Sequence, residues 1–263
     1  MNGWKLSAAA GYMMKGDGCR VASYRHGRQV QSRPGASDVQ PQQVSCVSAS
    51  FCLSADAFGN ADIWNGSSWS ASPAVAGFQF VGSLSCLSAT FCEAVGEGPP
   101  GENAAAWNGT SWTDQATPGP ASAALNAVSC TAASSCEAVG QNFGTNQTIT
   151  LAESWNGSAW AIQTTPNPTA TQGSTLNAVS CTSATSCTAV GQYQSSNVST
   201  FGALLTVAEV WDGTAWSLES TPNTSTTHNL LLGVSCGAAQ VCTAVGQTAD
   251  SGGVDAQLIE SGD

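Results

Sequence analysis

A short cysteine motif recurs five times along the 263-residue chain and constrains its fold more than any other feature. Each copy has the form [VL]-S-C-x5-C, and the first cysteines of successive copies are 40, 44, 51 and 55 residues apart. A second motif, W-[ND]-G-x-x-W, follows each of the first four copies and contains eight of the nine tryptophans. Self-similarity at this spacing is typical of proteins assembled from one small repeated unit.

Each repeat predicts four short strands in a meander. In the fourth repeat, residues 176–180 form strand a, 187–191 form strand b, 209–211 belong to strand c, and Trp216 opens strand d. No segment shows helical periodicity. Units of this kind are too narrow to bury both faces alone and normally stack radially. We therefore predict an all-β fold, a five-bladed β-propeller of four-stranded antiparallel blades.

The fifth repeat stops before a tryptophan hairpin, although residues 258–261 match residues 151–154 of the third repeat. Upstream of the first cysteine motif, residues 24–34 loosely match W-N-G to T-P. If this segment supplies the outer strand of the last blade, the ring closes without an open sheet edge. We expect one propeller domain at 24–263 and a poorly defined leader at 1–23. The alternative is a fragment of a larger ring.

The ten cysteines of the repeated motif form five pairs that flank predicted turns between strands a and b. We expect a disulfide within each pair, with Cys19 left unpaired. A zinc site is disfavoured because the x5 spacing exceeds the usual spacing of zinc ligands and the pairs lie on separate blades, so we expect no metal and no cofactor. Disulfides at this density indicate an oxidising compartment and a secreted protein. The predicted bonds join Cys46 to Cys52, Cys86 to Cys92, Cys130 to Cys136, Cys181 to Cys187, and Cys236 to Cys242.

The paired tryptophans allow two interpretations. A turn of even length places Trp155 and Trp160 on the same face of the c–d hairpin, where they can interlock with the neighbouring blade. The same placement would also suit an aromatic platform for a sugar. Identical placement in four blades favours packing.

Charge excludes several classes of partner. All six Lys and Arg residues lie in the first 33 positions, while the chain as a whole has 17 Asp and Glu residues. Nucleic acid is an unsuitable partner because binding phosphates requires cations. Residues 34–263 offer no cations to an anionic membrane, and no apolar run of about 18 residues exists to insert into a bilayer.

The combination of S-C-x5-C-x-A-V-G with W-N-G-x-x-W resembles the repeats of secreted propeller-like proteins from actinobacteria and other soil bacteria. This resemblance covers about residues 40–260 and implies a propeller fold without fixing a substrate. The c–d turn is also similar to the Asp-box hairpin of sialidase-type propellers, but residues 154–160 have Asn in place of Asp and one residue fewer before Trp. Closure with five blades resembles the tachylectin-type sugar-binding propellers in shape alone.

Length variation points to one face for binding. From the second cysteine to the first tryptophan the spacing grows from 12 to 15, 19 and 24 residues, which places the variation in the b–c connections. Variable loops on a rigid scaffold commonly carry binding sites. Amides beside aromatic rings suit a neutral glycan or a protein surface. The candidate ligand-binding residues are Glu97, Gln141, Gln192, Gln247, Asn142, Phe143 and Tyr193, although such residues also serve simply to solvate loops.

Catalysis has weaker support in the sequence, and the question of an enzyme stays open. The chain has two histidines and no recognisable nucleophile or phosphate-binding motif. The alternative function is a carbohydrate-active hydrolase or lyase that uses carboxylates near the propeller axis. The carboxylates at shared repeat positions are Asp62, Glu153, Glu209 and Glu260, two positions before the first tryptophan or its equivalent, and Glu93 and Glu137 after the second cysteine. The leading prediction is a secreted binding or adhesion module with no catalytic residues assigned.

Overall fold

The computed structural model describes strands at 5–6, 12–15 and 18–21, and then residues 41–75, 77–144, 146–169, 171–197, 202–223, 228–239, 241–249 and 255–262. Every regular element in these ranges is a β-strand, as the sequence predicts. The first three strands, β1 (Lys5–Leu6), β2 (Tyr12–Lys15) and β3 (Gly18–Val21), form an antiparallel sheet of their own. Residues 24–34, the predicted closing strand, lie outside the described residues.

Five antiparallel units follow, one for each cysteine motif, and they are numbered here as repeats 1 to 5. Repeat 1 consists of β4 (Pro41–Ser48), β5 (Phe51–Asp56), β6 (Ala61–Trp64) and β7 (Trp69–Ser72). Repeat 2 consists of β8 (Phe80–Ser88), β9 (Phe91–Gly98), β10 (Gly101–Trp107) and β11 (Trp112–Gln115). Repeat 3 consists of β12 (Ala123–Ala132), β13 (Ser135–Phe143), β14 (Thr148–Trp155) and β15 (Trp160–Gln163).

The last two repeats follow the same order. Repeat 4 consists of β16 (Thr171–Ser183), β17 (Ser186–Ser195), β18 (Leu204–Trp211) and β19 (Trp216–Glu219). Repeat 5 has three described strands, β20 (His228–Ala238), β21 (Val241–Ala249) and β22 (Asp255–Gly262). Single parallel backbone pairs connect β14 to β16 and β18 to β20.

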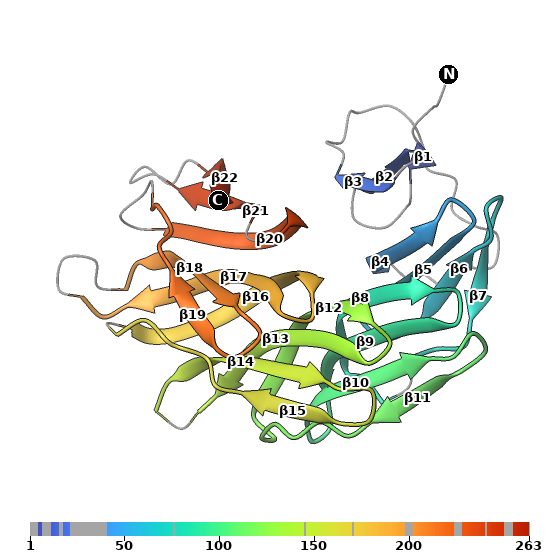
Figure 1. Cartoon of the computed structure of the whole chain (residues 1–263), viewed down its shortest axis with the longest axis horizontal. Helices are drawn as coiled ribbons and strands as arrows, with labels where there is room; N and C mark the ends of the chain where they lie inside the picture. Colours follow the sequence, from blue (N-terminus) through green and yellow to red (C-terminus); the bar gives the residue numbers. More distant parts are fainter. Residues whose placement is uncertain are drawn as a thin grey trace.

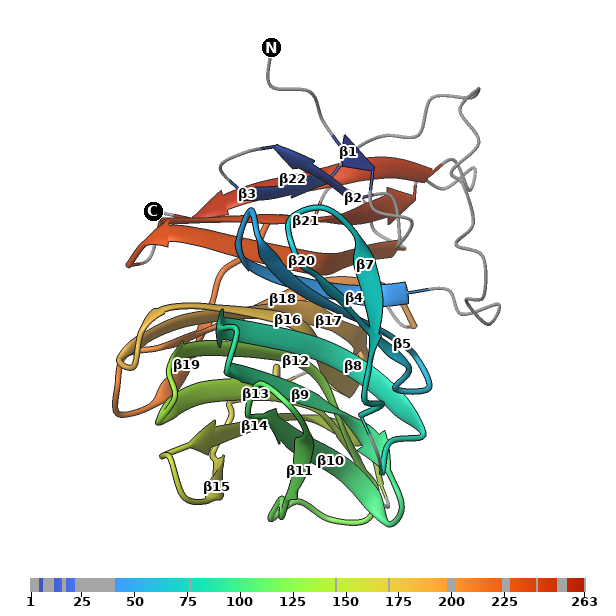
Figure 2. The same cartoon turned by 90° about the vertical axis from the view of Figure 1, so that its right-hand side faces the viewer.

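The repeats follow one another around an arc, with β4–β7 and β20–β22 at its two ends (Figures 1 and 2). The first strand of each repeat packs beside the first strand of the next. The predicted radial stacking of antiparallel units is therefore confirmed, and the fold is propeller-like. Closure into a ring of five blades stays a prediction, because it depends on residues outside the described part.

Small apolar side chains fill each boundary between repeats, and four hydrophobic clusters correspond to the four boundaries. Between repeats 3 and 4, for example, Val139 and Ala152 pack against Leu176, Val179 and Ala189. Alanine and valine are short, so the sheets approach each other closely. The hydrophobic core is consequently divided among the boundaries between repeats.

A hydrogen bond fixes the register across every boundary. The serine of the V-S-C motif accepts a bond from the backbone N–H of the cysteine in the following repeat. A serine is thus needed at this position for a contact outside its own repeat, which explains why it recurs. The four bonds join Ser45 Oγ to Cys86 N at 2.9 Å, Ser85 Oγ to Cys130 N at 3.0 Å, Ser129 Oγ to Cys181 N at 3.0 Å, and Ser180 Oγ to Cys236 N at 3.1 Å.

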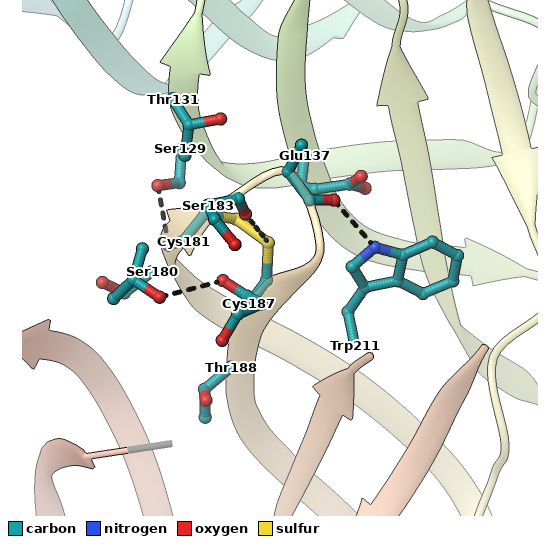
Figure 3. The surroundings of a disulfide bond; sticks show 12 residues. Ser129, Thr131, Glu137, Ser180, Cys181, Ser183, Cys187, Thr188 and Trp211 are labelled. Atoms are coloured by element: carbon teal, nitrogen blue, oxygen red, sulfur yellow. Dashed lines mark hydrogen bonds between the residues drawn. A yellow bond between two sulfur atoms is a disulfide. The ribbon is translucent and has the colours of Figure 1, made fainter. Parts of the chain in front are cut away.

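All five predicted disulfides are present. Each joins directly opposed residues of strands a and b, with Cα atoms 3.9–4.0 Å apart. Figure 3 shows the bond between Cys181 and Cys187, with Ser129 of the preceding repeat reaching Cys181. Each bond therefore fastens one hairpin, whereas contacts between repeats are non-covalent.

The tryptophan motif closes the c–d hairpin and anchors it. Trp155 and Trp160 are directly opposed, with ring centroids 5.7 Å apart. In the turn between them, Asn156 Oδ1 accepts hydrogen bonds from Ser158 N, Ser158 Oγ and Ala159 N, and Gly157 has a φ of 93°. Glycine adopts this left-handed conformation without steric cost, which accounts for the W-[ND]-G pattern.

The first tryptophan of each hairpin also donates to the a–b turn of its own repeat. Trp211 Nε1, for example, donates to Ala184 O at 3.1 Å, beside the disulfide of repeat 4 (Figure 3). The bonds in the other repeats join Trp64 to Ala49, Trp107 to Ala89, and Trp155 to Ala133. These contacts support the packing interpretation of the tryptophan pairs.

Replacement of Ser129 by alanine tests the register bonds. The variant Ser129→Ala leaves the Cys181 N–H without its acceptor, and we expect the protein to lose about 1–2 kcal/mol of stability. Denaturant unfolding of the oxidised protein measures this loss. The matched control is Ser217→Ala, an exposed position on β19, which should change stability by less than about 0.5 kcal/mol. Equal effects of the two variants would show that the boundary bond contributes nothing specific.

Candidate functional site

The antiparallel order of the strands places the b–c connections at the opposite end of each repeat from the disulfides. In the described part these connections comprise residues 57–60, 99–100, 144, 146–147, 196–197 and 202–203, and we call the surface where they emerge the b–c face. Part of the variation in length extends the strands instead of the loops, since β5, β9, β13 and β17 have 6, 8, 9 and 10 residues. The b–c face is therefore formed partly by strand ends, and strand b becomes longer from repeat 1 to repeat 4.

Four of the predicted binding residues occupy one equivalent position of strand b. Glu97 and Gln247 are exposed there, while Gln141 and Gln192 are half-buried. Gln141 Oε1 accepts a hydrogen bond from the Thr175 hydroxyl of repeat 4. Gln141 consequently has a structural contact across a boundary.

The other predicted residues differ in how accessible their side chains are to a ligand. Asn142 Oδ1 accepts a hydrogen bond from Ser122 Oγ at 3.1 Å. Phe143, at the end of β13, is 48% exposed, whereas Tyr193 is half-buried against the cluster between repeats 3 and 4. Phe143 is thus the predicted aromatic ring that remains open to a ligand.

Two exposed phenylalanines of the b–c face escaped the sequence analysis. Phe58 is 77% exposed in the 57–60 connection, and Phe80 is 44% exposed at the start of β8. The loop that carries Phe58 is fixed because Asp56 Oδ1 accepts hydrogen bonds from the backbone N–H groups of Phe58 and Asn60. The signal in the sequence that could have identified Phe58 is an aromatic residue in a b–c connection, between the polar residues Asp56 and Asn60.

The b–c face therefore offers exposed phenyl rings, the exposed amide of Gln247 and the exposed carboxyl group of Glu97. Phenyl rings can stack on apolar faces of a ligand, and amides can both donate and accept hydrogen bonds. In the described part, this face has no Lys or Arg to attract an anion. The arrangement suits a neutral polar ligand.

Five buried glutamates form a second unusual feature, located at the boundaries between repeats. Their side chains are at most 6% exposed, and no Lys or Arg occurs after residue 33 to neutralise them. Burying an ionised carboxylate without a cation is strongly unfavourable, so such groups keep their protons. The five residues are Glu93, Glu102, Glu137, Glu153 and Glu209.

Burial raises the pKa of all five groups. The pKa of Glu93 rises to about 9, although the nearby amide of Gln115 opposes the shift, and the pKa of Glu137 rises to about 8 against a similar effect of Gln163. Burial likewise raises the pKa of Glu209 to about 8. With pKa values near 8 and 9, Glu93, Glu137 and Glu209 are mainly protonated at neutral pH within the interfaces.

Glu102 of repeat 2 and Glu153 of repeat 3 face each other across their boundary. Burial, and to a smaller extent the neighbouring Glu102, raise the pKa of Glu153 to about 9; burial also raises the pKa of Glu102. The sequence analysis missed Glu102, which stands five residues before Trp107 where repeats 3 and 4 have Thr150 and Thr206. Since both carboxyl groups are buried, a substrate cannot reach this pair as it stands in the structure.

Glutamine connects the second tryptophan of a hairpin to the preceding repeat. Trp160 Nε1 donates to Gln115 Oε1, and Trp216 Nε1 donates to Gln163 Oε1, both at 2.6 Å. In repeat 1 the equivalent of these glutamines is Ser72. Its side chain is too short to replace a glutamine, and Trp112 Nε1 is buried without an acceptor among the described residues.

The described residues contain neither a metal-binding cluster nor a membrane-spanning helix. No group of three or more His, Cys, Asp or Glu side chains in that part is arranged to hold a metal ion. The same part contains no helix of the length and hydropathy needed to cross a membrane.

Comparison with known proteins identifies the fold without identifying a family. No family model matches the chain, and no curated protein matches it in sequence. Among solved structures, the RRP9 WD40 repeats superpose with a TM-score of 0.58 at 14% identity, and U3-55K superposes with 0.57 at 12%; each match covers 89% of this chain and 69% of the other. WD40 repeats form β-propellers. The chain is therefore similar to propellers in fold.

Two further structures are similar in the same way. YCF48, in a structure with bound D1 peptide, has a TM-score of 0.52 at 12% identity, and the match covers 97% of this chain and 76% of YCF48. The GH74 xyloglucanase from Xanthomonas campestris has a TM-score of 0.52 at 10% identity, over 76% of this chain and 34% of the enzyme. At these identities the likeness concerns the fold alone.

The buried acids predict an unusual dependence of stability on pH. An ordinary glutamate has a pKa of 4.5, whereas that of Glu93 is about 9 in the folded protein. Between these values the folded chain binds more protons than the unfolded chain, so stability is fully present at low pH and falls as the pH rises through this window. Each group can contribute up to about 1.4 kcal/mol per pH unit. Thermal unfolding between pH 5 and 9 measures the fall.

The variant Glu93→Gln removes one titrating group while keeping its size. We expect Glu93→Gln to be more stable than the native protein at pH 8, with a difference that shrinks toward pH 5. Glu219→Gln, at an exposed position on β19, serves as the control and should show no such trend. A gap that stays constant with pH would contradict ionisation of Glu93 as its cause.

The Trp112 indole N–H is buried without an acceptor among the described residues, and this predicts a stabilising substitution. In Ser72→Gln the new side chain can accept the hydrogen bond from Trp112 Nε1, as Gln115 does for Trp160, and we expect a gain of about 1 kcal/mol. Chemical denaturation provides the measurement. The same substitution at Ser70, an exposed neighbour on β7, should give no gain. If Ser72→Gln leaves the free energy of unfolding unchanged, the Trp112 indole does not gain an acceptor in this way.

Proposed function

We propose that the protein is a secreted binding module that recognises a neutral glycan or a protein surface through the b–c face. The observation that carries this proposal is the exposure of Phe58, Phe80 and Phe143 on that face. Exposed phenyl rings cost solvation free energy in the free protein, and a ligand that covers them recovers it. A rigid scaffold lowers the entropic cost of binding.

The propeller-like fold supports a binding or scaffold role, since the solved structures that share it include a peptide complex and a polysaccharide-degrading enzyme. Five disulfides fit an extracellular protein, because such bonds persist in oxidising surroundings. On this basis we propose that the protein is exported from the cell. The buried position of Glu102 and Glu153 gives no support to the hydrolase alternative.

Binding screens with matched variants test the proposal. A glycan array and a peptide library, both probed with the intact oxidised protein, should yield a saturable ligand. The variants Phe143→Ala and Phe58→Ala should each weaken its binding by about tenfold or more. Leu218→Ala, which truncates a comparably exposed side chain on β19, is the control and should bind like the native protein. A ligand whose affinity is lowered by Leu218→Ala and not by either phenylalanine variant would place the site elsewhere.

A further inference from the structure

The b–c face carries an exposed carboxylate beside a phenyl ring in repeat 2. Glu97 on β9 is exposed and is directly opposed to Phe80 on β8, whose ring is 44% exposed. Directly opposed residues of an antiparallel pair have their side chains on the same face, with Cβ atoms roughly 4.5–5.5 Å apart. The carboxylate and the phenyl ring therefore belong to one surface.

A second phenyl ring is carried by the neighbouring connection of repeat 1. The backbone N–H of Val81 donates to Ala57 O at 2.8 Å, so the 57–60 connection lies against the start of β8. Phe58 directly follows Ala57, and Phe80 directly precedes Val81. We define the Phe–Glu patch as Phe58, Phe80 and Glu97, all of which are exposed.

Glu97 differs from its counterparts in the later repeats, which have glutamine at this position. In repeat 3 the glutamine is Gln141, and its Oε1 accepts a hydrogen bond from Thr175 of the following repeat. The residue of repeat 3 at the position of Thr175 is Ala124. Alanine has no side-chain donor, so Glu97 lacks the contact that engages Gln141. The Glu97 carboxylate is consequently available to a ligand.

This part of the b–c face suits a positively charged group, whereas the amides elsewhere on the face suit a neutral polar one. A guanidinium or ammonium group is attracted to the face of an aromatic ring and also pairs with a carboxylate. Of the exposed aromatic rings in the described part, Phe80 is the one directly opposed to a carboxylate, whereas Phe143 is opposed to Thr148. The combination of ring and carboxylate therefore distinguishes the Phe–Glu patch.

The charge of the whole chain acts in the same direction. The formal net charge is −11, and residues 34–263 contain no Lys or Arg. The electrostatic field of such a protein attracts a basic partner and repels an acidic one. The repeats also have no cation of their own that could compete with a ligand for Glu97.

We propose that the Phe–Glu patch binds an arginine side chain on the surface of a partner protein. This inference rests on the binding function proposed above and selects the protein surface as the ligand of the b–c face. The guanidinium group stacks on the Phe80 ring and pairs with the Glu97 carboxylate, while Phe58 contacts the apolar part of the arginine side chain. Arginine fits better than lysine because its planar group can stack on a ring and pair with a carboxylate together.

An arginine peptide and its uncharged analogue test the patch. The probe is acetyl-Gly-Arg-Gly-amide, and the analogue has citrulline, which keeps the shape of arginine without its charge. NMR titration of the intact oxidised protein should show saturable binding of the arginine peptide and binding of the analogue that is weaker by about fivefold or more. Glu97→Gln and Phe80→Ala should each weaken binding of the arginine peptide by a similar factor. Glu97→Gln introduces the residue that the later repeats have at this position, so its fold should be retained.

A second glutamate variant separates a local site from the effect of net charge. Glu219→Gln, at an exposed position on β19, changes the net charge equally and should bind the arginine peptide like the native protein. Equal losses in Glu97→Gln and Glu219→Gln would overturn the proposal, and so would the absence of saturable binding of the arginine peptide. A ligand from the screens above that depends on Phe58 or Phe143 but not on Glu97 would preserve the binding function and reject the arginine site.

Discussion

The boundary between neighbouring repeats is the interaction on which the rest of the structure depends. No single sheet can bury both of its faces, and the side chains that cover them are mostly alanine and valine. Short side chains require close approach, and close approach requires that every backbone polar group at the contact has a partner. The serine–cysteine hydrogen bond provides that partner at each of the four boundaries.

The same boundaries hold the buried acids, and this combination has a physical explanation. The repeats, which lie beyond residue 33, contain no Lys or Arg of their own to neutralise an interior carboxylate. The remaining solution is a proton, and the glutamine amides beside Glu93 and Glu137 offset part of the rise in pKa that burial causes. Folding of this protein at neutral pH is therefore coupled to proton uptake.

Periodicity in the sequence was sufficient to predict the strand order, the disulfides and the opposed tryptophans, because each depends on contacts within one repeat. Contacts between repeats were harder to predict. Nothing in the spacing of Ser129 or Gln115 indicates that their partners lie in the following repeat. The candidate site was predicted in part: Phe143 is exposed as expected, but Gln141 and Tyr193 are engaged by neighbouring repeats, and Phe58 lies outside the repeated motif.

Each of the five disulfides in the described repeats spans only six positions of the sequence and stays within its own hairpin. A whole unit can consequently be duplicated or deleted by a genetic event without leaving a half-cystine that lacks its mate. Oxidative folding is simplified for the same reason, since each thiol finds its nearest neighbour regardless of how many units the polypeptide contains. The number of units in such an array is thus free to change during evolution while the chemistry of each remains the same.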